Sequence, residues 1–348
     1  MFMYSDYSQH LLDHVKKIHF IGCGGSGMYP LIQILAAKGY ELSGSDVLDG
    51  SIIRYEREMG VKVSLGHNAD NVVGADMVVY SAAISKDNVE LNAAASYGIP
   101  TVERSVLLGY VSRLYKQSIC VSGTHGKTTT TSMCTHIIMA ARMDPTVMIG
   151  GTLPALGAGH RVGKGDTIIL ESCEYCNSFL SFFPTVAVIL NVDADHLDFF
   201  KDLEDVKHSF RRFAQLVPEG GAVIADGDDA NTMDALKGLE KPILTFGLEQ
   251  GDIHAADLTY ERGVGSFNLI YRGENLGRIT LQVPGVHNVR NALAAAGAAL
   301  QLKVPFAAIQ EGLHAFTGAG RRFERKGEYH GAVLYDDYAP HPGELRAL

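Results

Sequence analysis

The segment from residue 123 to residue 130, Gly-Thr-His-Gly-Lys-Thr-Thr-Thr, limits the possible folds of this chain more than any other. It follows a short apolar run at residues 118–121 and precedes a helix-compatible stretch, residues 128–142. In such a strand–turn–helix, backbone N–H groups point at an anion, the lysine reaches the β- and γ-phosphates, and the next hydroxyl can hold Mg²⁺. We therefore predict a nucleotide phosphate site. The usual pattern has a glycine in place of Val121, and a helix N-cap beside a solvated lysine is the structural alternative.

The composition is that of a globular protein with real cores. The 348 residues predict two or three domains, and 46% of them are hydrophobic. The net charge is −9 without any lysine–arginine run, so nucleic acid is not an expected partner. No apolar stretch approaches the roughly 20 residues of a membrane helix, and the N-terminus lacks a signal-peptide core, so no membrane partner is expected. Five cysteines do not indicate a disulfide framework, and a cytoplasmic location follows.

The first part of the chain, residues 1–115, alternates strand and helix patterns. This alternation predicts an α/β fold, a Rossmann-like parallel sheet with helices on both faces. The expected strands are 17–22, 40–45, 61–64 and 76–81, and the expected helices are 28–38, 52–59 and 88–97.

A second α/β domain, of the P-loop ATPase type, is expected at residues 116–320. Residues 266–271 and 277–283 form a polar hairpin pattern, which predicts a small side sheet. From residue 321 a third element begins, with a strand at 332–335 and a helix start at Pro342. A strand and one helical turn cannot form a core, so residues 321–348 are expected to be the start of a truncated third domain or to fold onto the second. The other expected strands of the second domain are 167–170, 186–191, 222–225 and 243–246, and its helices are 202–216 and 288–300.

A second glycine-rich loop, residues 22–27, follows the first strand and satisfies G-x-G-x-x-G. Asp46, at the end of the second strand, stands where a Rossmann domain places a ribose-binding acid. The physical requirement is a pyrophosphate at a helix N-terminus and a carboxylate for hydroxyl groups. NAD and a UDP-sugar meet it equally well, and a tight structural turn is the third possibility.

Several acidic and polar residues follow strands of the second domain, where ligands of α/β sheets bind. Glu171 and Glu174 are candidate Mg²⁺ ligands. Residues 191–198 hold three carboxylates and His196, which indicates a metal or phosphate-transfer site. Cys173 and Cys176 form a C-x-x-C, but without a second such pair we interpret them as small residues flanking a functional carboxylate.

Three further candidates lie towards the C-terminus. Asn288 and Asn291 share a helix face and could read an adenine edge, although capping by Asn288 explains them nearly as well. Arg322, beside Arg321, could clamp a transferring phosphoryl group or lie in a solvated linker. Asp337 could bind ribose hydroxyl groups.

Taken in order, these motifs resemble the Mur ligase family of peptidoglycan synthesis, and the likeness runs from about residue 17 to the end. The N-terminal glycine loop is most similar to the alanine-adding branch, and less to the branch that adds a murein tripeptide. The residues that carry the likeness are His19 to Met28, Ser43 to Asp46, Ser81 to Ile84, Asp87 and Asn88, Gly123 to Thr130, Asn191 to His196, His287 to Asn291, Arg321 to Glu324 and Asp336 to Ala339.

The resemblance implies ATP-dependent ligation of L-alanine to UDP-N-acetylmuramate through an acyl phosphate, and so resolves the cofactor question in favour of a UDP-sugar. It implies catalytic roles for Lys127, Glu171, His196 and Arg322. It also implies Mg²⁺ ligation by Thr128 and Glu171, with His196 at a second Mg²⁺. The ATP contacts it implies are Gly123, Thr124, His125, Gly126, Lys127, Thr128, Thr129, Asn288, Asn291 and Asp337. The implied UDP-sugar contacts are Gly24, Gly25, Ser26, Gly27, Met28, Asp46 and Ser81.

Three departures qualify the resemblance. Pro340 replaces a usual histidine and leaves His341, and Tyr29-Pro30 stands where the family usually has small residues. By family expectation most of the third domain is missing, so low or no activity is expected. A UDP-sugar-binding regulatory module with a vestigial ATPase is the alternative from another class. An NAD-dependent dehydrogenase would leave the loop at residue 123 unexplained.

Overall fold

The computed structural model describes residues 11–339 and residue 345, and the chain divides into two compact units. Unit 1 is Met1–Leu114 and unit 2 is Tyr115–Leu348. Pro340, His341 and Pro342, which the sequence singled out, lie outside the described residues.

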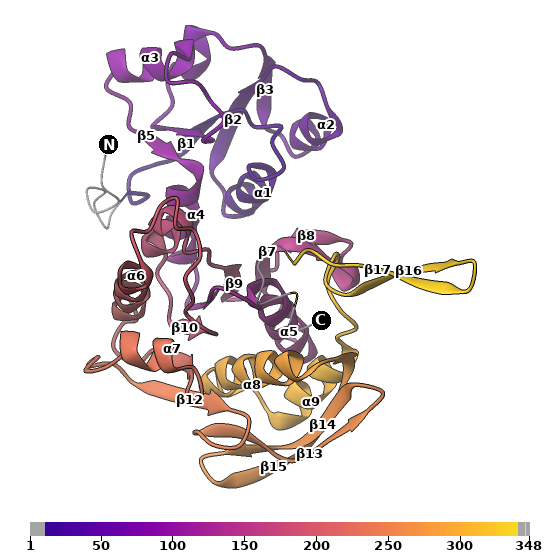
Figure 1. The fold of residues 1–348 in the computed structure, drawn as a ribbon. Coiled ribbons are helices and arrows are strands. Elements are labelled where there is room, and N and C mark those ends of the chain that lie inside the picture. The colour runs from indigo at the N-terminus through magenta and orange to yellow at the C-terminus, as the bar shows by residue number, and fades with distance from the viewer. Residues whose placement is uncertain (1–10, 340–344, 346–348) are drawn as a thin grey trace. The chain divides into compact units, whose positions relative to one another are not determined.

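Unit 1 is built on a five-stranded, fully parallel sheet in the order β3-β2-β1-β4-β5. Its strands are β1 (Lys17–Ile21), β2 (Glu41–Asp46), β3 (Lys62–Leu65), β4 (Met77–Tyr80) and β5 (Thr101–Glu103). Its helices are α1 (Tyr29–Ala37), α2 (Ser51–Glu58), α3 (Val89–Ser96) and α4 (Arg104–Ser112), with a short 3₁₀ turn η1 (Ala69–Val72). In Figure 1, α1 and α2 lie on one side of the sheet and α3 on the other. The Rossmann-like fold predicted from the alternating pattern is confirmed.

The sequence did not predict β5 and α4. Strand β5 has only three residues, and α4 is buried at every position from Val106 to Ser112, so neither shows a one-sided pattern. The helix begins at Arg104 because Glu103 caps it by accepting a hydrogen bond from Ser105 N at 3.2 Å. The missed boundary matters because Arg104 packs against Gly27 of the first glycine-rich loop.

Unit 2 contains a ten-stranded mixed sheet in the order β15-β14-β13-β12-β11-β10-β6-β9-β7-β8. Strands β6 to β12 pair in parallel except for the edge strand β8. The strands are β6 (Gln117–Ser122), β7 (Thr146–Leu153), β8 (Ala158–Arg161), β9 (Thr167–Glu171), β10 (Val186–Ile189), β11 (Ala222–Asp226), β12 (Ile243–Gly247), β13 (Ile253–Glu261), β14 (Val264–Tyr271) and β15 (Glu274–Pro284).

The hairpin expected as a separate side sheet is part of this large sheet. Strand β13, which the sequence did not predict, pairs in parallel with β12 at Phe246↔Ile253 and Gly247↔His254, and in antiparallel fashion with β14. The second half of β13 is largely exposed and polar, so the sequence lacks the alternation of apolar and polar residues that would predict a strand there. The α/β architecture of the domain is otherwise as predicted.

Helices α5 (Lys127–Ala140), α8 (Val286–Gln301) and α9 (Phe306–Ala315) pack together in the core of unit 2. Small side chains let α8 approach closely: a Cβ at Gly297 would lie 2.6 Å from Ile253 Cδ1. This packing brings the N-termini of α5 and α8 together, and predicted site residues lie in the first two turns of each helix. The remaining elements are α6 (Leu203–Gln215), α7 (Ala230–Ala235), η2 (Pro154–Leu156) and η3 (Tyr175–Ser181).

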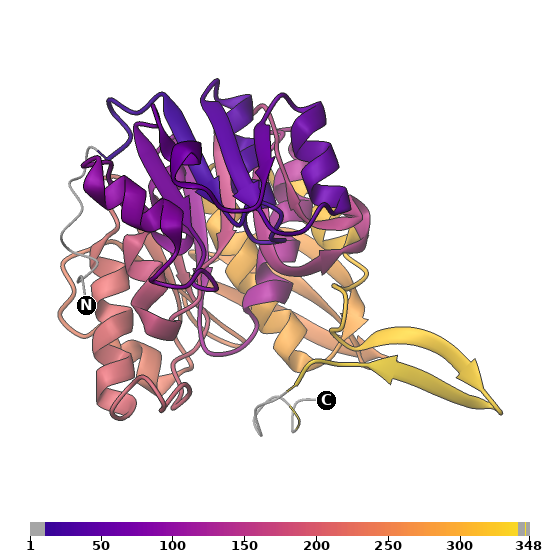
Figure 2. The same ribbon diagram turned by 90° about the horizontal axis from the view of Figure 1, so that it is seen from above.

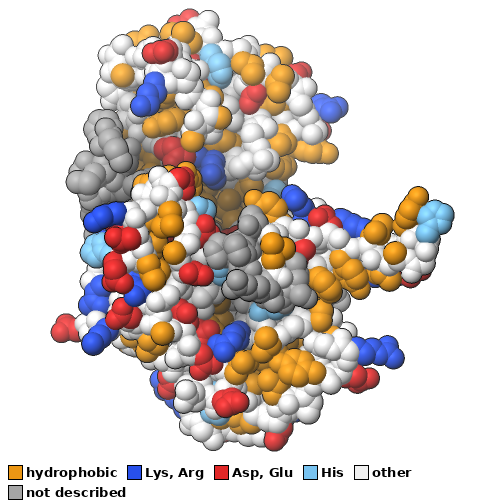
Figure 3. All heavy atoms as spheres, viewed as in Figure 1, with side chains coloured by type: hydrophobic (Ala, Val, Ile, Leu, Met, Phe, Trp, Pro, Cys, Tyr) orange, Lys and Arg blue, Asp and Glu red, His pale blue; other side chains and the backbone are white. Residues whose placement is uncertain are grey.

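Strands β16 (Glu324–Tyr329) and β17 (Ala332–Asp336) form a two-stranded antiparallel sheet. Figures 1 and 2 show this hairpin extending away from the large sheet of unit 2. Apolar side chains on it face solvent, as Figure 3 shows; they include Tyr329, Val333, Leu334 and Tyr335. Throughout residues 11–339, every helix is too short or too polar to cross a bilayer.

Candidate active site

The turn between β6 and α5 ends at a helix N-terminus with open N–H groups. Gly126 has a φ of 84°, and the first bond of the helix runs from Thr130 N to Gly126 O at 2.9 Å. The N–H groups of residues 127–129 therefore have no partner within the helix and suit an anion. Two features require glycine at position 126. Its φ is positive, and a Cβ there would lie 2.6 Å from Asn291 Oδ1.

The loop after β10 occupies the N–H groups of Thr124 and His125 in this turn. Thr124 N donates to Asn191 O at 3.2 Å, and His125 N donates to Asn191 Oδ1 at 2.7 Å. In return, Asn191 Nδ2 donates to His125 O at 3.1 Å and Asp193 N donates to Thr124 Oγ1 at 2.9 Å. These four bonds tie the two loops together, so the Thr124 and His125 amides are not open to a phosphate in this structure.

The amine of Lys127 lies inside the turn and is paired with an acid. Its Nζ donates to Gly123 O at 2.5 Å and to Glu174 Oε2 at 3.0 Å. The pair is largely buried, with 15% of the lysine side chain and 2% of the glutamate side chain exposed. A phosphate that binds the open N–H groups would therefore meet a lysine that already neutralises a carboxylate.

Two acidic groups flank Lys127 and Thr128. On one side Glu174, Asp195 and His196 bring their ligand atoms within 4.8 Å of one another. On the other side Thr128 Oγ1 donates to Glu171 Oε1 at 3.0 Å. Carboxylate and hydroxyl oxygens are the donors that Mg²⁺ prefers, so the residues present fit this ion.

The structure changes how the predicted metal residues are grouped. We expected Thr128 and Glu171 at one ion and His196 at a second, and the structure groups His196 with Glu174 and Asp195. Both Glu171 and Glu174 follow the core of β9, and the turn after it is kinked, with φ values of 52° at Cys176 and 57° at Asn177. Nothing in the sequence reveals that kink. Cys173 and Cys176 are free thiols, as are the other three cysteines.

The α8 residues Asn288 and Asn291 lie next to the phosphate turn and are both 8% exposed. Asn288 Nδ2 donates to Pro284 O at 2.6 Å, and Asn291 Nδ2 donates to Asn288 Oδ1 at 3.3 Å. Asn291 Oδ1 faces Gly126 so closely that it leaves no room there for a Cβ. The side chain of Asn288 bonds back to Pro284 rather than capping α8, so the capping alternative is not what the structure contains.

Arg322 and Asp337 lie on the segment that follows α9. Arg322 Nη1 donates to Tyr338 O at 2.8 Å, and Asp337 Oδ2 accepts from Phe323 N at 2.6 Å. This segment is anchored to β7 where Gly320 N donates to Thr152 O at 2.7 Å. Burial lowers the pKa of His287 at the start of α8, and the negative charge of Asp337 opposes that shift, so Asp337 acts close to α8.

The glycine loop of unit 1 also ends at a helix N-terminus. Gly24 N donates to Asp46 Oδ2 at 2.9 Å, so the acid at the end of β2 is bonded to the loop itself. Met28 is buried, and its N–H donates to Gly25 O at 2.9 Å, so this residue offers no open group. The N–H groups of Ser26 and Gly27 form no hydrogen bond within the described residues.

A cation that the sequence pattern did not reveal, Arg104, lies against this loop. A Cβ at Gly27 would lie 3.4 Å from Arg104 Cζ, so the guanidinium packs against the loop beside its open N–H groups. Arg104 forms no ion pair or hydrogen bond within the described part of the chain. The sequence shows an arginine directly after a short strand, but it indicates a place beside the loop only when the position of α4 is known.

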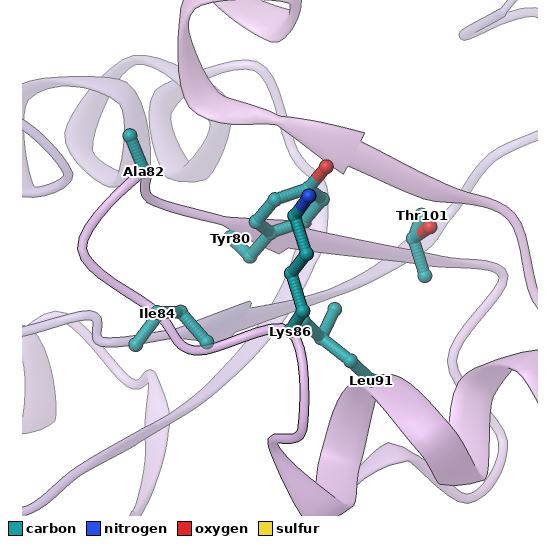
Figure 4. Close-up of a pocket in the computed structure, with 6 residues that line it drawn as sticks. All are labelled: Tyr80, Ala82, Ile84, Lys86, Leu91 and Thr101. Atoms are coloured by element: carbon teal, nitrogen blue, oxygen red, sulfur yellow. The ribbon is translucent and has the colours of Figure 1, made fainter. Parts of the chain in front are cut away.

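A cavity of about 320 Å³ lies beside the same loop. Figure 4 shows Ala82, Ile84 and Lys86 on the loop after β4, around the opening. Tyr80, Leu91 and Thr101 complete the lining. The loop is adjacent to the glycine turn, because Ile84 Cδ1 and Ser81 Oγ lie 3.2 and 3.9 Å from a Cβ placed on Gly22.

Two buried carboxyl groups in unit 1 have opposite environments. Burial acts to raise the pKa of Glu90, but hydrogen bonds from His19, Ser45 and Asn71 outweigh it and lower the pKa to about 2. Burial raises the pKa of Glu56, on α2, to about 7; the Cys23 thiol lowers it in part, and the charge of Asp46 raises it further. Glu90 is thus a satisfied structural carboxylate, whereas Glu56 titrates near neutrality under the glycine loop.

Known proteins match this chain over most of its length. The profile of the Mur ligase middle domain matches residues 121–299, and that of the Mur ligase family catalytic domain matches residues 17–116. The UDP-N-acetylmuramate–L-alanine ligase of Caldanaerobacter subterraneus subsp. tengcongensis is 48% identical over 97% of this chain and 74% of its own length. The enzyme of that name from Clostridium novyi is 44% identical with the same coverage.

Solved structures give the same result. The UDP-N-acetylmuramate–alanine ligase of Thermotoga maritima has a TM-score of 0.75 and 29% identity, covering 95% of this chain and 76% of that one. The UDP-N-acetylmuramate:L-alanyl-γ-D-glutamyl-meso-diaminopimelate ligase of Neisseria meningitides also scores 0.75 at 29% identity, covering 88% of this chain and all of that one. With these matches over nearly its full length, the chain belongs to the Mur ligase family.

Proposed function

We propose that this chain joins L-alanine to UDP-N-acetylmuramate with ATP as the phosphoryl donor, as the names of its relatives suggest. The observation that carries the proposal is the juxtaposition in unit 2 of an open helix N-terminus, Lys127 and the cluster of Glu174, Asp195 and His196. This is a combination for phosphoryl transfer, in which positioning and charge neutralisation supply most of the catalysis. A vestigial module would not need to keep all three parts.

The chemistry explains why a nucleotide is needed. A carboxylate is a poor electrophile because its oxygen leaves badly. Transfer of the γ-phosphoryl group of ATP to the lactyl carboxylate gives an acyl phosphate, and attack by the alanine amine then releases phosphate. The N–H groups of residues 127–129 and the Lys127 amine would hold the phosphoryl oxygens during transfer.

Lys127 must change partners when the nucleotide binds. It leaves Glu174, which is then free to take another cation, and it contacts the β- and γ-phosphates. Glu174, Asp195 and His196 would hold Mg²⁺, with Thr128 and Glu171 as a second set. Bound Mg²⁺ would supply positive charge between the phosphates and the carboxylates. Arg322 would add a further positive charge at the γ-phosphate, as the family resemblance implies.

The rest of ATP fits the start of α8. Asn291, which faces the phosphate turn, and Asn288 are proposed to contact adenine, and Asp337 the ribose. The electrostatic effect of Asp337 on His287 supports its place near α8.

Unit 1 is proposed to bind the UDP-sugar. The open N–H groups of Ser26 and Gly27, with the Arg104 guanidinium beside them, suit a pyrophosphate. Gly24 and Gly25 give the turn its shape, and Asp46 and Ser81 lie at its edge for uridine contacts. Met28 takes part only through the packing of α1. We place the reaction in the cytoplasm, where ATP is present and the five thiols stay reduced.

The test is a titration calorimetry series followed by turnover. UDP-N-acetylmuramate is titrated into the chain, then Mg²⁺ with a non-hydrolysable ATP analogue, and phosphate release is measured with L-alanine. Binding of both ligands and alanine-dependent release would support the proposal. L-alanyl-γ-D-glutamyl-meso-diaminopimelate serves as the competing amine, and faster release with it would favour the activity named for the Neisseria structure. Absence of sugar binding would overturn the substrate assignment.

A further inference from the structure

A pair of polar side chains outside the site holds the loop of residues 191–196 from the side opposite the phosphate turn. They stand after β11, at the start of α7. Asp229 Oδ2 accepts from Val192 N at 3.1 Å, and Asn231 Nδ2 donates to Val192 O at 2.9 Å. Both backbone groups of Val192, a residue only 1% exposed, are thus paired with side chains as a neighbouring strand would pair them.

Val192 is the central link in a series of hydrogen bonds. Its neighbours Asn191 and Asp193 make the four bonds to Thr124 and His125 of the phosphate turn. The same loop continues directly to Asp195 and His196. A shift of Val192 would therefore move two candidate metal ligands and the phosphate turn relative to each other.

We propose that Asp229 and Asn231 are positioning residues, which fix Asp195 and His196 relative to the phosphate turn without touching either ligand. The inference rests on the proposed function of unit 2. Such support matters because ligand groups must be held within about 0.5 Å of the productive geometry. Loss of groups that orient metal ligands typically costs roughly 10- to 100-fold in metal affinity.

A competing explanation is helix capping alone. Asp229 is the N-cap of α7, since its Oδ2 also accepts from Thr232 N at 2.9 Å. The chain offers a matched control in Asp202, the N-cap of α6, whose Oδ1 accepts from Asp205 N at 3.0 Å. Asp229→Ala and Asp202→Ala each remove one aspartate cap, but only the first releases Val192.

The probe is Mn²⁺, whose binding is followed by electron paramagnetic resonance in the presence of a non-hydrolysable ATP analogue. The measurement is made at a temperature where circular dichroism shows each variant folded. Asp229→Ala is expected to weaken Mn²⁺ binding by roughly tenfold or more. Asp202→Ala is expected to change it less than about twofold, since a cap affects mainly helix stability.

A second variant separates the loop contact from the cap. Asn231→Asp keeps the size of the side chain but cannot donate to Val192 O, and its charge would repel that carbonyl. It is expected to weaken Mn²⁺ binding by roughly tenfold while the cap of α7 stays intact. If Asp229→Ala matches Asp202→Ala and Asn231→Asp binds Mn²⁺ like the wild type, the positioning role is overturned. If the wild type itself binds no Mn²⁺ with the nucleotide analogue, the proposed function of unit 2 fails first, and this inference with it.

Discussion

The two glycine-rich loops look alike in sequence but are built on opposite plans. In unit 2 the turn carries its own cation, Lys127, and its Thr124 and His125 amides donate to Asn191. In unit 1 the turn has no cation of its own: Arg104 comes from α4, and the nearest acids are Asp46 and Glu56. Both turns end at a helix N-terminus, so the difference lies in where the charge comes from.

In unit 1 the residue that supplies the positive charge lies outside the turn that it serves, whereas in unit 2 it is part of the turn. In unit 2, the cation, the phosphate contacts and the metal ligands stand on neighbouring loops that hydrogen bonds and the Lys127–Glu174 pair link together, so one substitution affects all of them. In unit 1, the cation is held by a separate helix, so removing it should leave the turn intact. We expect substitutions in unit 2 to abolish turnover and those in unit 1 to tune substrate affinity.

The largest effect is expected from Lys127→Ala. The change removes the positive charge at the transferring phosphoryl group and leaves Glu174 buried without its partner, so kcat for phosphate release should fall roughly 10³-fold or more. Affinity for UDP-N-acetylmuramate should stay within a few-fold by calorimetry. Lys201→Ala, at a side chain 86% exposed, is the control. Equal losses of turnover and sugar affinity would contradict the assignment of ATP to unit 2 and of the UDP-sugar to unit 1.

The second-largest effect is expected on metal binding, and it distinguishes Glu171, the last residue of β9, from Glu174, which follows that strand. Glu174→Gln should weaken Mn²⁺ binding by roughly 10- to 100-fold, because the side chain belongs to the cluster with Asp195 and His196. Glu171→Gln keeps an oxygen for Thr128 Oγ1 and should have a smaller effect. Paramagnetic resonance titrations of both variants provide the comparison. A larger loss for Glu171→Gln would favour Glu171 as the main acidic ligand, as the family resemblance implies.

In unit 1, Arg104→Gln should lower UDP-N-acetylmuramate affinity by roughly 10- to 100-fold, the scale of a hydrogen bond to a charged group. Nucleotide binding to unit 2 should be unchanged in the same preparation. Arg57→Gln, which removes an arginine paired with Asp49 on a partly exposed surface, is the matched control. If both arginine variants bind the sugar like the wild type, the loop obtains no charge from α4.

The sequence predicted the two α/β units and the turn at Gly126 because these depend on local patterns. The alternation of elements and the open helix N-terminus follow from apolar runs and glycine spacing. What it could not predict depends on long-range packing or on irregular backbone. Arg104 became a site residue only through α4, and the choice between Glu171 and Glu174 depends on the positive φ values of Cys176 and Asn177.

Glu56 is a further case in which pattern and structure disagree. It lies three residues after Ile53 on α2, on the face that periodicity assigns to apolar side chains, and both residues are fully buried. Only the packing of α2 against the glycine loop shows that Glu56 is enclosed, beside Cys23 and near Asp46.

The smallest effect therefore concerns the acidic surroundings of the unit 1 loop. Because the pKa of Glu56 is raised from 4.5 to about 7, its contribution to stability is fully present below pH 4.5 and is lost as the pH rises through 7. Glu56→Gln removes this titration and keeps the shape. We compare the free energy of unfolding of the variant with that of the wild type, from urea titrations at pH 5 and pH 8. The advantage of the variant over the wild type should be about 2 kcal/mol larger at pH 8 than at pH 5. Parallel pH profiles of the two proteins would show that Glu56 is not buried as a neutral acid. The claim that the unit 1 loop has Glu56 as an acidic neighbour with a raised pKa would then be wrong.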